Sequence, residues 1–198
     1  MASFPLPLSA SIPVRVVSLL VAAASVLAVA APATAGCPPF PRPLCRDFGQ
    51  TSLAIDADGH FDWRAARGPA TSLADFGAGQ TNSPWLLCAW DDRGLVVAAD
   101  IPAGAECRGA SCWTETGKQR LFYLDETGSN GDIRALDFFA NAKPRTKLRG
   151  LVSVIGGINL PLGGRVTVQL TRADSPVCFE SALAAESFHR NDKRGSRG

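Results

Sequence analysis

The segment 56–62, Asp-Ala-Asp-Gly-His-Phe-Asp, carries the residue types with the most definite chemistry. Asp56, Asp58 and Asp62 offer carboxylate oxygens, which are the ligands that calcium prefers. When Gly59 is aligned with the glycine of an EF-hand loop, Ala65 falls at the last ligand position, where the loop requires a bidentate glutamate. Asp-Gly is also a strong signal for a hairpin turn. We therefore interpret the segment as a turn, keep the three aspartates as an incomplete metal site, and predict no cofactor.

Side chains for nucleophilic catalysis are scarce. His60 and His189 are the only histidines, so a Ser-His-Asp arrangement would have to use one of them. The motifs of serine hydrolases, P-loop proteins and zinc proteases are absent from the sequence. Hydrolysis by two carboxylates leaves no such motif, because it depends on a separation through space. We predict no catalytic residue, and a secreted hydrolase with a carboxylate pair remains the alternative function.

The four tryptophans, Trp63, Trp85, Trp90 and Trp113, allow two interpretations. They could stack against sugar rings and form a carbohydrate-binding platform. In a β domain, aromatic side chains of this size more commonly fill the core, because they bury a large apolar area. We expect core positions for them.

The six cysteines are expected to form disulfides, because their spacing lacks the second pair or the nearby histidine of a zinc site. Sequence alone does not choose among the many pairings. Two of the cysteines lie in strand-like runs, two flank a small turn and two bracket a proline-rich arm. These positions favour the pairs Cys88–Cys178, Cys107–Cys112 and Cys37–Cys45.

Residues 1–35 have the features of a secretory signal peptide. Arg15 precedes the uncharged apolar run 16–31, and the segment ends in Ala33-Thr34-Ala35. The apolar run is shorter than the roughly 20 residues of a spanning helix. The neighbouring Thr-Ala-Gly-Cys is similar to a lipobox, which would make a lipidated Cys37 the alternative to cleavage. We expect a secreted, periplasmic or cell-surface protein that contacts a membrane only through the signal peptide or this lipid.

Alternation of apolar and polar residues dominates the rest of the chain. In 165–171, for example, Val166, Val168 and Leu170 share one face, which is typical of a half-buried strand. A hairpin is predicted at 51–64, and the strand-like runs 86–90 and 95–99 are separated by turn residues at 91–94. The pattern indicates an all-β fold of about nine short strands, an antiparallel β-sandwich or jelly-roll-like domain stabilised by disulfides. Only the segment 181–187 has a pattern that a short helix would fit.

The expected organisation is a signal peptide at 1–35, a proline-rich arm at 36–47, a single β domain at 48–185 and a disordered basic tail at 186–198. The formal net charge of +2 lacks the basic character of a nucleic-acid-binding protein, so no nucleic-acid partner is predicted. An extracellular polymer or glycan is the partner class that an exported module of this kind would meet.

Motifs along 60–185 resemble a group of exported bacterial β-rich domains for which no activity is known. They are Trp63 followed by Arg-Ala-Ala-Arg-Gly, Ala-Asp-Phe-Gly at 74–77, Leu-Cys-Ala-Trp-Asp at 87–91, the Cys-x4-Cys-Trp of 107–113, Asn-Leu-Pro-Leu at 159–162, Val-Thr-Val-Gln-Leu at 166–170 and Cys-Phe-Glu at 178–180. In the last motif Phe179 replaces the tryptophan of the group. The resemblance implies the domain boundaries but no substrate. We therefore expect a non-catalytic binding or structural module outside the cell.

Overall fold

The computed structural model describes residues 36–56, 58–77, 83–143, 146–153, 160–184, 190–192 and 195–197. The chain divides into two compact units, Met1–Ala33 and Thr34–Gly198, and the description below concerns the second. The predicted signal peptide lies outside the described residues. Within the described ranges, no helix has the length and apolar character needed to cross a membrane.

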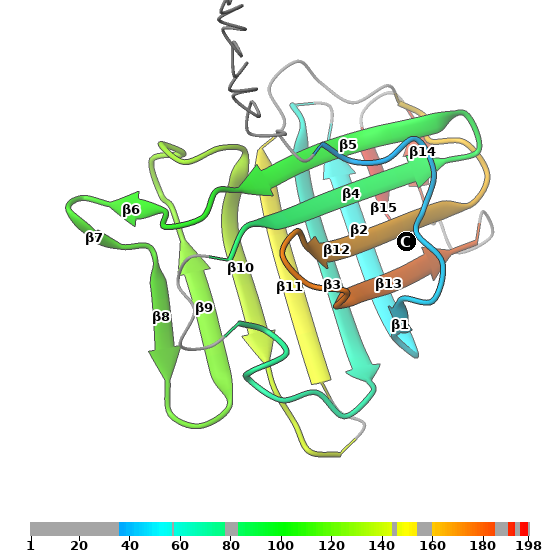
Figure 1. Ribbon diagram of the computed structural model, residues 1–198. Helices are drawn as coiled ribbons and strands as arrows, with labels where there is room; N and C mark the ends of the chain where they lie inside the picture. Colours follow the sequence, from blue (N-terminus) through cyan, green and yellow to red (C-terminus); the bar gives the residue numbers. More distant parts are fainter. Residues whose placement is uncertain are drawn as a thin grey trace, which may run out of the picture. The chain divides into compact units, whose positions relative to one another are not determined.

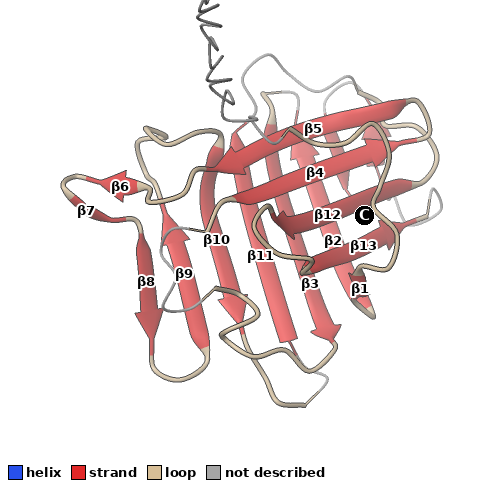
Figure 2. Cartoon of the chain, viewed as in Figure 1, coloured by secondary structure: helices blue, strands red, loops and turns tan. Residues whose placement is uncertain are grey.

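The all-β prediction is confirmed, and the sandwich consists of two packed sheets whose strands cross steeply (Figures 1 and 2). The first sheet has the order β1 (Arg46–Asp47), β13 (Cys178–Leu183), β12 (Val166–Arg172), β4 (Trp85–Asp91) and β5 (Gly94–Ile101). The second has the order β14 (Arg190–Asp192), β15 (Gly195–Arg197), β2 (Gln50–Asp56), β3 (His60–Gly68), β11 (Thr146–Ser153), β10 (Ile133–Phe139), β9 (Arg120–Leu124) and β8 (Trp113–Thr116). A small hairpin of β6 (Glu106–Cys107) and β7 (Ala110–Ser111) lies outside both sheets.

The described residues form fifteen strands, more than the predicted number. The excess comes from short strands such as β1, β6 and β7, each two residues long, in which no alternation pattern can develop. The predicted hairpin at 51–64 is confirmed, and the strand-like runs 86–90 and 95–99 belong to β4 and β5. β2 pairs with β3 across Asp58-Gly59, where Gly59 has a φ of 83°, and β4 pairs with β5 in antiparallel register.

The core between the sheets is aromatic. The Phe138 ring stacks on Phe76 at a centroid distance of 4.7 Å and lies 4.9 Å from the Trp85 ring. The four tryptophans are 0%, 1%, 3% and 8% exposed in chain order, which confirms the core interpretation and leaves none of them available as a sugar platform. Trp90 is buried in a different way, because its Nε1 donates a hydrogen bond of 3.1 Å to the carbonyl of Pro38 in the arm.

Two of the three predicted disulfides are wrong, whereas Cys107–Cys112 is confirmed. Cys37 pairs with Cys88 on β4, and Cys45 pairs with Cys178 on β13. Strand β12 lies between β4 and β13, so the strands of Cys88 and Cys178 are two strand spacings apart, roughly 10 Å. This separation exceeds the reach of a disulfide, about 7 Å between Cα atoms. The Cys37–Cys88 disulfide also uses the Cys37 thiol, to which the lipid of the lipidated alternative would be attached.

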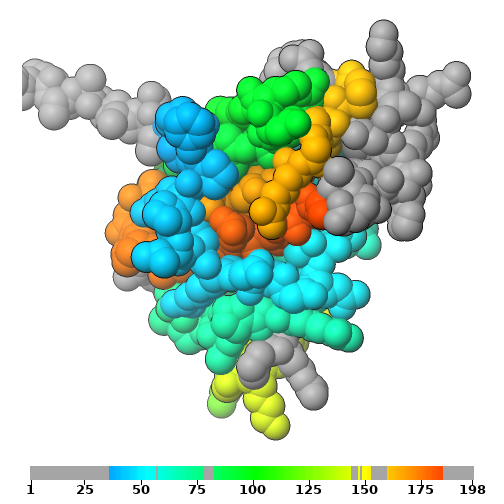
Figure 3. Space-filling view, turned by 90° about the vertical axis from the view of Figure 1, so that its right-hand side faces the viewer, coloured from blue at the N-terminus to red at the C-terminus, as the bar shows by residue number. Residues whose placement is uncertain are grey.

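The proline-rich arm is therefore a strap across the first sheet, joined to a strand at each end. Figure 3 shows its blue residues lying against the sheet. In the middle, Gln169 of β12 donates to the Arg42 carbonyl (2.8 Å) and accepts from the Arg42 N–H (2.9 Å). The prediction that β12 exposes its polar face is wrong at Gln169 and Thr171, which are 0% and 5% exposed. Gln169 is buried because the strap covers it.

The C-terminal residues also differ from expectation. Residues 181–183, assigned to a short helix by their pattern, belong to β13. In the predicted disordered tail, 190–192 and 195–197 form a hairpin, and β15 pairs with β2. The physical reason is that β2 would otherwise present an unpaired strand edge, and backbone groups can complete such an edge whatever their side chains are.

Candidate functional site

A groove lies on the outer face of the second sheet, opposite the core. We call it the sheet groove. It has a volume of about 390 Å³, within the range of roughly 300–1,000 Å³ typical of ligand sites. Its lining comes from β2, β3, β10 and β11: Gln50, Thr51, Ser52, Arg64, Ala65, Ala66, Asp137, Phe139, Lys147 and Arg149.

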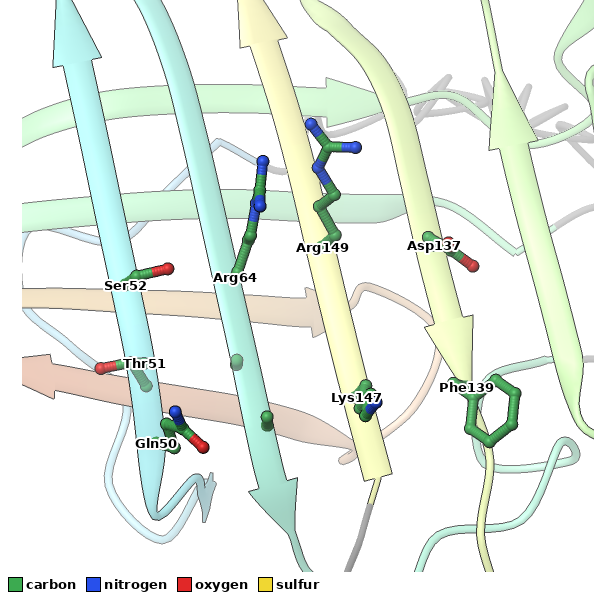
Figure 4. Close-up of a pocket in the computed structure, with 10 residues that line it drawn as sticks. Gln50, Thr51, Ser52, Arg64, Asp137, Phe139, Lys147 and Arg149 are labelled. Atoms are coloured by element: carbon green, nitrogen blue, oxygen red, sulfur yellow. The ribbon is translucent and has the colours of Figure 1, made fainter.

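Strand alternation brings the longer polar side chains of the lining to one surface, whereas Thr51 and Ala65 occupy the alternate, core-facing positions of their strands. In β3, Phe61, Trp63 and Ala65 are buried, so the residues between them face outward. Sheet register then aligns one residue from each neighbouring strand, so that Ser52, Arg64, Arg149 and Asp137 follow one another across the sheet (Figure 4). Ala66 has only a methyl group, which leaves room for a ligand beside the longer neighbours.

Two arginines share one carboxylate at the end of the groove that is uppermost in Figure 4. Arg64 Nη2 lies 2.8 Å and Arg149 Nη2 lies 3.1 Å from Asp62 Oδ2, and both Nε atoms approach Oδ1. Burial raises the pKa of Asp62, but the hydrogen bonds from the two guanidiniums outweigh it and hold this pKa below its usual value. Because one negative charge serves two guanidiniums, the trio is positive.

The lower end combines a cation with an aromatic ring. Lys147 is exposed and lies opposite Phe139 in the register of β10 and β11. No described acidic residue pairs with Lys147. Phe139 is 37% exposed, a high value for a phenylalanine in a sheet.

Asp137, the one acid in the groove lining, is already paired. Both of its oxygens accept hydrogen bonds of 2.8 Å from the Arg120 guanidinium. The groove and its immediate partners therefore contain four cations (Arg64, Arg120, Lys147, Arg149) and two carboxylates (Asp62, Asp137).

The three aspartates of the incomplete metal site do not lie together. Asp56, Asp58 and His60 lie together at the β2–β3 turn, whereas Asp62 binds the two arginines of the groove. Asp56 Oδ1 accepts the backbone N–H groups of Asp58 (3.0 Å) and His60 (2.9 Å), and its Oδ2 lies 3.0 Å from His60 Nδ1. The oxygens of Asp56 therefore stabilise the turn.

None of the described acids with a resolved pKa shift has the raised pKa of a general acid. A general acid needs a raised carboxyl pKa. Burial raises the pKa of Asp91, for example, but hydrogen bonds from Arg93 and the Gly163 N–H reverse the shift and lower it. The pKa is lowered in every described acid for which a shift is resolved: Asp56, Asp62, Asp75, Asp91, Asp125 and Asp174.

The groove residues were missed in the sequence because they are individually ordinary. Alternation identifies Arg64 as an outward residue of its strand, and the same rule would place Lys147 and Arg149 on one face of theirs. What the sequence lacks is the order of strands, since β3 and β11 pair across some 80 intervening residues.

Comparisons with family models, curated proteins and solved structures found no match for the chain. The sheet groove and the three disulfides are the features of the molecule that bear on its function. Disulfides of this number are typical of an oxidising compartment outside the cytoplasm.

Proposed function

We propose that the protein is an exported, non-catalytic β-sandwich module that binds an extracellular polymer or glycan in the sheet groove. The observation that carries the proposal is the groove itself. It is an open depression on a hydrogen-bonded sheet, lined by amide, hydroxyl, guanidinium, ammonium and aromatic groups. Binding sites on sheets hold their side chains in place with little loss of entropy, because the backbone is already ordered.

Several features support export. The signal-like segment 1–35 precedes the domain, and all six cysteines lie beyond it and form disulfides. The motifs along 60–185 follow the order seen in the exported bacterial β-rich domains that the chain resembles, and this resemblance also supports export. The six described acids with a resolved pKa shift all have lowered values, so none of these six is tuned as the general acid of a carboxylate pair.

The test is a binding screen of the purified, oxidised protein against soluble polysaccharides, combined with a variant that fills the groove. Ala66→Trp places an indole where Ala66 lines the groove. Ala98→Trp is the matched control, because Ala98 is an exposed alanine of β5 in the other sheet. We expect Ala66→Trp to abolish binding and Ala98→Trp to preserve it, with both variants melting near the parent temperature. A screen without any binding, or binding that survives in Ala66→Trp, would overturn the proposal.

A further inference from the structure

We infer that the ligand of the sheet groove is an acidic polysaccharide, whose sugar rings carry carboxylate or sulfate groups. This inference rests on the proposed function and adds the chemical class of the ligand. It comes from the charges that the groove leaves uncompensated and from the neutral groups that lie beside them.

The positive charge of the groove favours an acidic ligand. Each of Arg64 and Arg149 uses its Nε and one Nη on Asp62, and a guanidinium has five N–H donors. The remaining donors of both side chains are available to a ligand, since these side chains are 59% and 48% exposed. A guanidinium binds the oxygens of an anionic group in a bidentate way, as it does those of a carboxylate.

The spacing of the cations along the groove favours a polymer with repeated charges. Arg149 and Lys147 are two residues apart on β11 and share its outer face, so their α-carbons lie about 7 Å apart. A polymer with repeated acidic groups can contact both cations along β11. A chain that lies along β11 would therefore bind through more than one charge.

The opposite wall offers neutral polar groups. Gln50 and Ser52 of β2 face outward and contribute an amide and a hydroxyl, which suit the hydroxyl groups of a sugar ring. Phe139 adds an exposed ring at the end of the groove. A membrane surface is less suitable, because Phe139 is the one large apolar side chain in the groove lining and nothing there would insert among lipid chains.

The experiment measures binding of the oxidised protein to four probes by isothermal titration calorimetry. They are polygalacturonate (carboxylate), dextran sulfate (sulfate), neutral dextran, and vesicles that contain phosphatidylglycerol. Arg64→Gln/Arg149→Gln removes two cations from the groove. Arg108→Gln/Arg165→Gln makes the same charge change at two exposed arginines outside the groove lining.

We expect one or both acidic polysaccharides to bind and neutral dextran not to bind. Arg64→Gln/Arg149→Gln should weaken that binding about tenfold or more, because charge-assisted hydrogen bonds are lost. The control pair should change it less than about twofold at physiological salt, where distant exposed charges are screened. Carboxylate and sulfate are then distinguished by which of the two polymers binds more tightly.

The failures are separable. If neutral dextran binds as tightly as the acidic polymers, the acidic inference is wrong and the proposed function stands. If both arginine pairs weaken binding equally, the interaction is one of overall charge and the inference is wrong. Preferential binding to the vesicles would also overturn it. If no polysaccharide binds, the proposed function fails together with the inference.

Discussion

The strap predicts an order of importance for the disulfides. Cys45–Cys178 closes a separation of 133 residues and fixes the strap to β13, whereas Cys107–Cys112 closes a separation of 5 residues within a small hairpin. We compare Cys45→Ala/Cys178→Ala with Cys107→Ala/Cys112→Ala. Both pairs remove one disulfide and introduce the same side chain, so loop length is the main difference between them.

The expected magnitudes follow from the entropy that a closed loop removes from the unfolded chain. Separations of 133 and 5 residues correspond to about 5 and about 2 kcal/mol of stabilisation. The longer disulfide also secures the strap that covers Gln169 and Trp90, so its loss lets water reach both side chains. A typical domain has an unfolding free energy of about 5–15 kcal/mol, and the loss of the longer disulfide therefore removes a large part of it.

The assay is equilibrium urea unfolding, followed by the fluorescence of the four buried tryptophans. We expect the Cys45/Cys178 variant to unfold at markedly lower urea than the Cys107/Cys112 variant, or to be unfolded without urea. A Cys107/Cys112 variant that is equally or less stable would refute the reasoning, because loop length would then not control the contribution of the disulfides.

Two further predictions concern buried polar groups. Burial raises the pKa of Asp125, but hydrogen bonds from the Asn130 N–H and the Thr127 hydroxyl outweigh burial and hold this pKa well below its ordinary value of 3.8. The ionised Asp125 carboxylate therefore stabilises the fold above pH 3.8, and this stabilisation is lost as the pH falls further. Asp125→Asn should lower the unfolding free energy by about 1.5–3 kcal/mol at neutral pH. The difference in unfolding free energy between variant and parent should narrow in acid, and a difference in urea unfolding that stays constant across pH would contradict this. Burial, with Asp125 nearby, raises the pKa of Tyr123 to about 12, and its hydroxyl has no hydrogen-bond partner in the described structure. Tyr123→Phe should therefore leave the melting temperature unchanged or raise it, and a drop of many degrees would reveal a partner for this hydroxyl.

The sequence predicted the features that depend on local pattern. Strand-like runs located β4 and β5, Asp58-Gly59 located the turn between β2 and β3, and the size of the tryptophans indicated core positions. The Cys107–Cys112 disulfide was also predictable, because a short turn between two cysteines brings them together whatever the rest of the chain does.

Features that depend on strand order were not predictable. Cys88 and Cys178 both lie in strand-like runs, but only the topology shows that β12 separates their strands. Gln169 looks like a surface residue until the strap is placed over it. The sheet groove has the same origin, since Arg64 and Arg149 become neighbours only through the pairing of β3 with β11.

Amide chemical-shift mapping with an oligogalacturonate shows directly whether the ligand binds in the sheet groove. We predict that the perturbed amides cluster in 50–52, 64–66 and 147–149, with Phe139 beside them. Shifts confined to the strap, at Phe40, Arg42 and Leu44, would contradict the account, because they would place the ligand on the opposite sheet.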